Sequence, residues 1–447
     1  MKTFLERLAP ATALSRTERG LIGLLVILTV AFCAVTVGRQ AFLNTRKGDQ
    51  GVFFRTAWAV RTGTSLYTIT DEHGWHYLYP PFLASVLLPL ADPPAEVLAG
   101  PSPPIVVPYW VSCTLWYWLN IACLAMALHL VAAALERHWG AGVGPPWPRY
   151  SRGWWALRLW PFLAISLYVG SSLQSGQVTT LLLLCLSGCA ASLIDARSGR
   201  AGLWLGTAIG LKLFPAYLLL YPLLRRDLRF LLGAGVATLL TILIPFAIMG
   251  PSAAMTAYRE LVIGVLLGEA TNNINPAVIQ ELHGSDGPIQ SFQYILYHVA
   301  HWPGPAPASL PPHLFFVLHG AVSAAVTAAA LFAMRKRADG LGEFLFFASL
   351  ACLCLPILPV SRPHYFAIAA IALAGVLASQ WSVRRGLWPG WAATSIIALL
   401  LAAEIPTIAD VRAFVDLGAT TLATLALIAY AISLGRKRVT AGVQPMP

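Results

Sequence analysis

The sequence predicts an all-α integral membrane protein whose chain crosses the bilayer many times. Of its 447 residues, 57% are hydrophobic and only 11% are charged, whereas soluble domains carry about a quarter charged residues. Apolar runs of about 20 residues, the length that a spanning helix needs, recur along the chain. The 30 Lys and Arg outnumber the 19 Asp and Glu and gather between these runs, as topology signals do. We expect one polytopic domain over residues 1–447, with about 10–12 transmembrane helices and no nucleic-acid partner.

The first apolar run, residues 20–38, follows a basic segment and is expected to leave the cytoplasm. Residues 39–108 then form a first extracytoplasmic loop. It holds an amphipathic stretch, 52–67, and an apolar piece, 82–90, which is too short to span and is interpreted as an interfacial or partly inserted helix. The next three spans are expected at residues 109–135, 154–172 and 178–194.

A broken or re-entrant helix is expected near Lys212. The run 202–224 should cross outward, yet it ends in arginines that the positive-inside rule places in the cytoplasm. An interruption at 210–215 resolves the conflict, with two half-helices that enter and return on one side; non-helical backbone is tolerated at depth where protein or a wet cavity satisfies it. The alternative is a full span whose terminal arginines bind lipid phosphates outside.

The remaining chain alternates in the same way. A span at 230–249 leads to a second extracytoplasmic loop, 250–312, and further spans are expected at 313–334, 344–358, 366–379, 388–405 and 414–434. Residues 435–447 then form a cytoplasmic tail, so both termini are expected inside. Most polar residues outside the basic runs fall on the outer side, and we therefore expect extracytoplasmic chemistry in a bacterial inner or plasma membrane.

Asp49 and Lys212 are the most informative charged residues. A carboxylate beside a membrane cavity can act as a general base, although Asp49 could instead be a solvated acid paired with Arg46 or Lys47. Lys212 lies inside an apolar run, where an ionised side chain costs roughly 2.5 to 3.5 kcal/mol on insertion scales. It suits an anionic ligand such as a lipid-linked phosphate; the alternatives are snorkelling to the interface or pairing with a buried acid.

A second group, Arg362, His364 and Tyr365, offers a guanidinium, an imidazole and a phenol beside two spans. Together these can hold a phosphate or move a proton, although Arg362 could simply anchor a helix end at the headgroups. His73 and His76 have no Glu or Cys to complete a ligand set, so no metal site is expected there.

Several short motifs occur in an order that resembles the GT-C superfamily of membrane glycosyltransferases, and most closely glycosyltransferase family 87, the polyprenyl-phosphate-sugar-dependent mannosyl- and arabinosyl-type transferases. These motifs are Asp49 after the first span, the aromatic and proline-rich turn 77–81, Ser175-Gly176-Gln177, the segment 210–215, Gln290-Ser291 and the segment 360–365. The resemblance implies a GT-C-like fold and a lipid-linked donor, which needs no nucleotide-binding motif.

By this resemblance, Asp49 is the base that deprotonates an acceptor hydroxyl, which attacks the anomeric carbon of a lipid-phosphate sugar with inversion. Lys212 and His364, helped by Arg362 and Tyr365, would bind the phosphate that leaves. The residues expected to line the substrate groove are Arg55, His76, Tyr79, Gln177 and Gln290.

The resemblance implies no cofactor, although a weak divalent-cation site at Asp71 and Glu72 stays open. The implied partners are a polyprenyl-phosphate sugar donor, a glycolipid or glycan acceptor, and membrane lipids. Two alternatives remain. A flippase or transporter of lipid-linked sugars would also use Lys212 and a broken helix, and an O-antigen ligase or polymerase-like enzyme would also join lipid-linked sugars outside. Polar residues on one side and short cytoplasmic loops favour an enzyme.

Overall fold

The architecture is that of a helical membrane protein. The computed structural model describes residues 14–42, 48–71, 74–101, 104–143, 149–267, 289–300, 312–381, 391–408 and 417–439. Regular structure in these ranges is helical, apart from an isolated antiparallel bridge between Thr70 and His76. Within them, eight helices are long and apolar enough to cross a membrane, and two shorter apolar helices accompany them. The polytopic fold that the sequence predicts is confirmed.

The long helices have the following bounds: α2 (Arg16–Phe42), α6 (Tyr109–Val143), α7 (Arg152–Gln174), α11 (Leu228–Met249), α16 (Pro312–Ala333), α17 (Gly340–Ile357) and α21 (Ala419–Val439). The eighth span joins the 3₁₀ turn η4 (Pro363–Ile368) to α18 (Ala369–Trp381). The two shorter apolar helices are α8 (Thr179–Ile194) and α19 (Trp391–Ile408).

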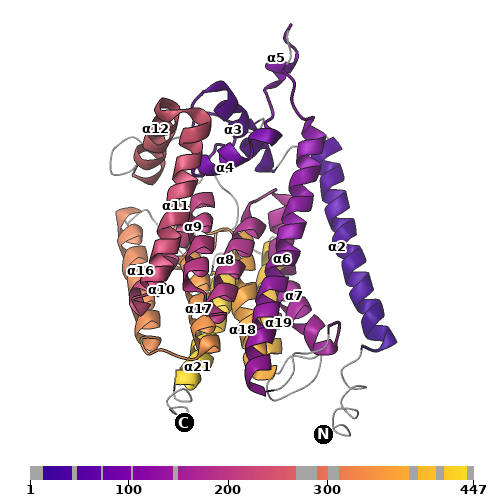
Figure 1. The fold of residues 1–447 in the computed structure, drawn as a ribbon, viewed down its shortest axis with the longest axis vertical. Helices are drawn as coiled ribbons and strands as arrows, with labels where there is room; N and C mark the ends of the chain where they lie inside the picture. Colours follow the sequence, from indigo (N-terminus) through magenta and orange to yellow (C-terminus); the bar gives the residue numbers. More distant parts are fainter. Residues whose placement is uncertain are drawn as a thin grey trace.

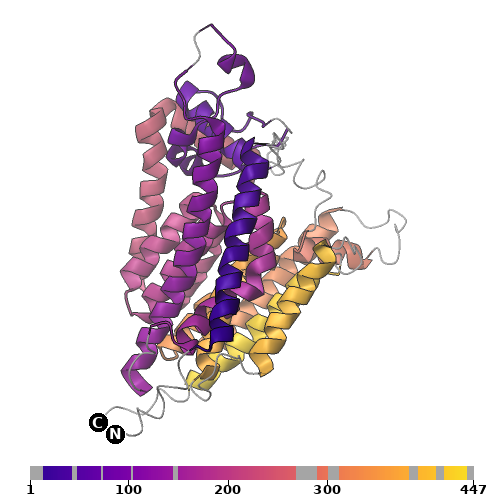
Figure 2. The ribbon, with the colours of Figure 1, turned by 90° about the vertical axis from the view of Figure 1, so that its right-hand side faces the viewer.

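The spanning helices run lengthwise, and a group of short helices gathers at one end (Figure 1). These short helices are α3 (Gln50–Thr62), α4 (Pro81–Val86), α5 (Ala95–Leu98) and α12 (Pro251–Glu260). We call this the loop end. Helix α2 begins and α21 ends at the opposite end, which we call the terminal end (Figures 1 and 2). Segments of both expected extracytoplasmic loops therefore share one end of the molecule.

Burial separates inner from outer helices. In the most apolar 18-residue stretch of each helix, 83% of the residues of α17 and 89% of those of the η4–α18 span are buried. The corresponding share is 22% in each of α2, α11 and α16. The outward apolar side chains of α2, α11 and α16 would contact lipid in a bilayer, where there is no water. The inner pair, α17 and α18, therefore forms the centre around which the site is built.

The break at Lys212 is present. Helix α9 (Ser198–Leu211) ends there, and Lys212 itself has an extended backbone. The 3₁₀ turn η2 (Phe214–Leu219) and the short helix α10 (Leu220–Arg225) follow. Pro215 cannot donate a backbone hydrogen bond, and its ring clashes with the preceding helical turn. The proline is the local reason why the helix stops here.

The segment after the break turns back toward the end of the molecule where α9 begins. Gly202 packs on Phe230 and Ala234, Gly206 on Ala234 and Thr238, and Gly210 on Thr241. Because the residue numbers of the contacts increase together in the two helices, α9 and α11 run parallel. The segment between them must therefore travel back toward the end where α9 began, which confirms the re-entrant form.

The arginines after the break lie at the terminal end. Arg225 Nε donates to Glu343 Oε2 at 2.7 Å, in the first turn of α17, and Arg225 Nη1 donates to the carbonyl of Arg335 at 3.2 Å. Asp339, which caps the same helix, pairs with Arg438 at 2.8 Å. The basic runs after α10, after α16 and at the end of α21 thus share one end, as the positive-inside rule requires.

Some boundaries differ from those expected. Helix α2 extends four residues beyond the apolar run on each side, and α21 continues through Val439 into the expected tail. The second loop holds α12, a π-helical turn (Leu261–Leu266) and α15 (Phe292–Ala300). Apolar runs mark the hydrocarbon core, whereas backbone hydrogen bonding continues into the polar interface, so runs underestimate helix length.

Candidate active site

Asp49 is held at the loop end by a turn between α7 and α8. It precedes the first turn of α3, and its backbone N–H donates to the Ser175 carbonyl at 2.8 Å. Gly176 has a φ of 63°, which favours glycine. The Gln50 side chain fills the space where a Cβ on Gly48 or Gly176 would lie. The motif Ser175-Gly176-Gln177 therefore serves to bring its own backbone close to Asp49.

Gln177 joins Asp49 to the first loop. Its Nε2 donates to Asp49 Oδ2, and its Oε1 accepts from the Tyr79 hydroxyl at 2.9 Å. The Gln177 residue is only 5% exposed, so these bonds form where water competes little. Tyr79 is also held by an edge-to-face contact with Phe53 of α3, with ring centroids 5.0 Å apart.

Lys212 lies at the other end of this chain of contacts. Its Nζ donates to the Tyr79 hydroxyl at 3.2 Å and to the Tyr365 hydroxyl. It also lies 4.4 Å from the Tyr79 ring centroid and 4.3 Å from that of Tyr365. Aromatic faces attract a cation, and the carboxyl end of α9 adds the negative end of a helix dipole. The break in the helix thus places a stabilised ammonium in the protein interior.

The direction of the hydrogen bonds in this chain is fixed by chemistry. An ammonium donates only, so the Tyr79 oxygen accepts from Lys212 and its hydrogen points to Gln177. The Gln177 carbonyl accepts that hydrogen, which turns the amide NH₂ toward the Asp49 carboxylate. A positive and a negative group are therefore connected through one oriented bridge, formed by Tyr79 and Gln177.

The η4 turn brings His364 to the same place. Its ring stands edge-to-face against Tyr365, with centroids 4.3 Å apart, and the residue is 3% exposed. Within the described part of the chain, His364 Nε2 has no hydrogen-bond partner. Arg362 lies 6.0 Å from the Trp75 ring centroid, which links η4 to the first loop. An imidazole beside an ammonium can bind an anion that enters between them.

Gln290 packs beside η4. Its backbone N–H donates to the Ser361 carbonyl at 2.7 Å, and its own carbonyl accepts from Thr421 at 2.6 Å. The structure therefore places the Gln290-Ser291 motif next to the segment 360–365.

Two predicted groove residues lie outside the bridge. Arg55 pairs with Asp92 at 3.3 Å, and both side chains are nearly buried. His76 forms the isolated antiparallel β-sheet pairing with Thr70 in the first loop. The structure brings Tyr79 and Gln177 to Asp49 and Lys212, but it gives Arg55 a local ion-pair partner instead.

Of the two acids of the possible cation site, Asp71 and Glu72, the structure describes only Asp71. Asp71 Oδ1 accepts from the backbone N–H of Trp75 at 2.9 Å. Glu72 and His73 lie outside the described residues. Among the residues that are described, no group of three or more His, Cys, Asp or Glu side chains is placed to hold a metal ion.

The first loop is tied to the site by neutral tyrosines. Tyr67 donates to the Tyr79 carbonyl at 2.9 Å, and Tyr77 donates to the Pro80 carbonyl at 2.8 Å. Burial raises the pKa of both phenols well above the ordinary value, so they stay protonated and keep donating. These bonds fix the backbone from which the Tyr79 side chain projects.

Several residues that support the Ser175-Gly176-Gln177 turn and α8 were not predicted from the sequence. Trp116 Nε1 donates to the Gly176 carbonyl at 2.8 Å, and Asn120, one turn further along α6, accepts from Thr180. A polar side chain inside a spanning helix is costly unless it has a partner. Asn120 in the apolar run of α6 was therefore a signal that this helix faces α8 and the turn before it.

The fold and the site define a class: a polytopic membrane protein with a small charged and aromatic site at the end where its loops gather. A family model described as glycosyltransferase family 87 matches residues 77–356, more than half of the chain. The chain belongs to this family, and it is a membrane glycosyltransferase. The matched region includes Tyr79, Gln177, Lys212 and Gln290, whereas Asp49 lies before it.

Solved structures are similar over most of the chain. Two crystal structures of ArnT from Cupriavidus metallidurans, one bound to undecaprenyl phosphate and one in the apo state, share 14% and 15% identity with it. They cover 93% and 95% of this chain and 78% of their own, with TM-scores of 0.37 and 0.36. No protein with curated annotation matches the chain.

Proposed function

We propose that the protein is an inverting glycosyltransferase that moves a mannose- or arabinose-like sugar from a polyprenyl-phosphate donor to a lipid or polysaccharide acceptor on the extracytoplasmic face. The observation that carries this proposal is the bridge of Tyr79 and Gln177, which joins the Asp49 carboxylate to the Lys212 ammonium. A base and an anion-binding group, held at a fixed separation, are what inversion at one carbon needs.

The reaction follows from the two ends of the bridge. Asp49 takes the proton of an acceptor hydroxyl, and the oxygen attacks the anomeric carbon from the face opposite the phosphate. The new C–O bond forms as the bond to the phosphate oxygen breaks, and that oxygen leaves with the electron pair. Lys212 stabilises the negative charge that develops on the phosphate, and His364 donates a hydrogen bond to it.

Gln177 and Tyr79 act on both ends. The Gln177 amide donates to the Asp49 carboxylate, which holds the carboxylate in one orientation. The Tyr79 hydroxyl holds Lys212 against its ring. Arg362, which lies against Trp75 at the rim of η4, is assigned to further phosphate oxygens.

The sugar and the side of the membrane rest on separate arguments. The mannose- or arabinose-like sugar comes from the resemblance of the motifs to family 87. The extracytoplasmic side is supported by the basic runs, which share the terminal end, opposite the loop end that carries Asp49.

The direct test is sugar transfer in isolated membranes that contain the wild-type protein or Asp49→Asn. We expect the wild type to transfer radiolabelled sugar from a polyprenyl-phosphate sugar. Asn is nearly isosteric but cannot accept a proton, so transfer should fall by at least about 10²-fold, with normal expression and membrane insertion. Transfer by Asp49→Asn at the wild-type rate would refute the assignment of the base.

A further inference from the structure

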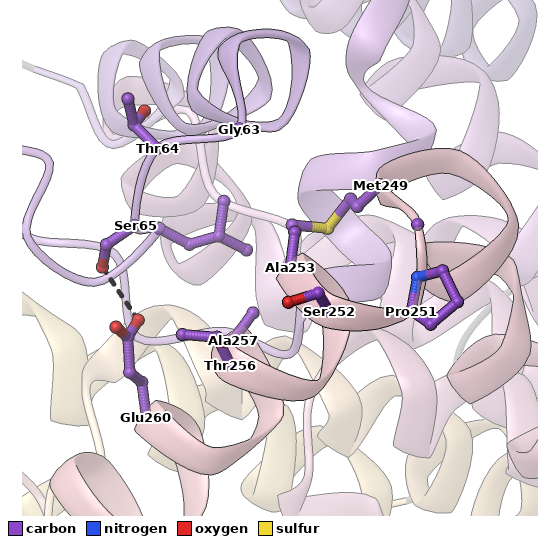
Figure 3. Close-up of a pocket in the computed structure, with 12 residues that line it drawn as sticks. Gly63, Thr64, Ser65, Met249, Pro251, Ser252, Ala253, Thr256, Ala257 and Glu260 are labelled. Atoms are coloured by element: carbon purple, nitrogen blue, oxygen red, sulfur yellow. Dashed lines mark hydrogen bonds between the residues drawn. The ribbon is translucent and has the colours of Figure 1, made fainter.

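A hollow lies at the loop end, and no residue of the bridge lines it (Figure 3). It has a volume of about 470 Å³, which falls within the range of roughly 300 to 1,000 Å³ typical of small-ligand sites. The carboxyl end of α3 and the segment after it form one side, and the end of α11 with α12 forms the other. Asp49 and Lys212 are not among its lining residues.

The lining chemistry suits a sugar. Four hydroxyl side chains line the hollow: those of Thr64, Ser65, Ser252 and Thr256. Glu260 adds a carboxylate, which accepts from Ser65 at 2.8 Å (Figure 3). Apolar surface comes from side chains such as that of Met249. A sugar ring offers both hydroxyl groups and apolar C–H faces, whereas the carboxylate would repel a phosphate.

Backbone is exposed on two sides of the hollow. Gly63 ends α3 with a φ of 70°, and Gly250 precedes α12 with a φ of 83°. A Cβ added at either glycine would meet no atom within 4 Å. Positive φ values favour glycine here, and the missing side chains let a ligand approach the peptide groups closely.

The hollow and the proposed base, Asp49, lie at opposite ends of α3. Asp49 stands at the start of α3 and Gly63 at its end, with 13 helical residues between them. At 1.5 Å per residue this is about 20 Å, a distance that a glycan of several units can span. We propose that the hollow binds a sugar unit of the acceptor, several units away from the hydroxyl that reacts. This inference rests on the proposed function only in taking a glycan as the acceptor.

The test measures glycan binding and transfer with the full-length protein in detergent. Neutral manno-, gluco- and arabino-oligosaccharides, from disaccharide to octasaccharide, are titrated without donor by calorimetry. Thr256→Trp fills the hollow from α12, and Glu260→Gln removes its charge without changing its shape. Met255→Trp is the matched control, because Met255 neighbours Thr256 but is 60% exposed and does not line the hollow.

We expect the wild type and Met255→Trp to bind one of the longer oligosaccharides, and Thr256→Trp and Glu260→Gln to bind it about tenfold more weakly, a loss equal to about 1.4 kcal/mol. In transfer assays, the acceptor KM should rise for long acceptors only, with kcat unchanged. Absence of oligosaccharide binding by the wild type, or equal binding by all four proteins, would overturn the inference. If glycans bind as expected but no polyprenyl-phosphate sugar is used, the proposed donor chemistry fails and the hollow stands.

Discussion

Gln177 lies between the Asp49 carboxylate and the Tyr79 hydroxyl that holds the Lys212 ammonium. Its amide cannot rotate without reversing both of its bonds, because Tyr79 presents a hydrogen to it and Asp49 presents a carboxylate. This residue was predicted to line the substrate groove. The structure places it between the two charged groups, and we propose that it positions the Asp49 carboxylate.

We expect Gln177→Leu, which keeps the volume but removes both bonds, to lower kcat by about 10²-fold, as the loss of one preorganised donor does elsewhere. The donor KM should change little, because Lys212 keeps Tyr365 as a partner. The measurement is steady-state transfer with varied donor. Tyr168→Phe is a control, since it removes a buried hydrogen bond from α7 to the Leu400 carbonyl of α19, which is not part of the bridge. Equal losses in both variants would indicate a folding effect.

Lys212→Met keeps the length of the side chain but removes the charge. A charged hydrogen bond contributes about 1.5 to 3 kcal/mol, so binding of polyprenyl phosphate should weaken by roughly 10- to 150-fold. The measurement is binding of undecaprenyl phosphate to purified protein. Affinity equal to that of the wild type would contradict the phosphate-binding role.

The residues of the site could be named from the sequence, but their connections could not. Asp49 and Lys212 stand out because ionised side chains beside or within apolar runs are costly. Gln177 meets Asp49 across 128 positions, and no local pattern reports such a contact. Arg55 had the same polar signal as Gln177, yet its partner is Asp92.

At the scale of elements, the pair of α9 and α11 holds the break in place. Gly202, Gly206 and Gly210 recur every fourth residue, so they form one face of α9, and that face lies against α11: the first two glycines meet its backbone, and Gly210 meets the Thr241 side chain. Small residues at this spacing let membrane helices approach closely. Lys212 follows this face by two residues, so close packing of the helices fixes where the ammonium stands.

Gly206→Ala should therefore destabilise the protein. The added Cβ would overlap the Ala234 carbonyl oxygen, which belongs to backbone and cannot turn away. Overpacking of this kind costs about 1 to 3 kcal/mol, and the midpoint of thermal unfolding in detergent should fall. Gly235→Ala on α11 is the matched control, because its Cβ would meet nothing within 4 Å. An unchanged midpoint for Gly206→Ala would contradict the close packing.

Apolar length predicted the spans well, and charge predicted the break. The run 202–224 looked like one span, and only the arginines after it indicated a return. The helices of the second loop, such as α12 and α15, were not predicted, because they are short and their stability comes from packing on the rest of the protein.

At the scale of the whole molecule, the two ends differ in charge and in role. The terminal end carries the basic runs, and the loop end carries Asp49 and the short helices. All seven cysteines are buried, so a new surface cysteine can be labelled against a low background.

We expect Thr64→Cys, at the loop end, to react with a membrane-impermeant maleimide in intact cells, because Thr64 is exposed. Arg229→Cys, exposed at the start of α11, should react only after permeabilisation. Labelling of Arg229→Cys in intact cells would contradict the orientation.

We propose that Asp49 and Lys212 act from opposite sides of one anomeric carbon. The most direct measurement is the anomeric configuration of the product, determined by NMR after transfer from a polyprenyl-phosphate sugar of known configuration. We expect a single product of inverted configuration, formed by the wild type and absent with Asp49→Asn. A product that retains the donor configuration would contradict it.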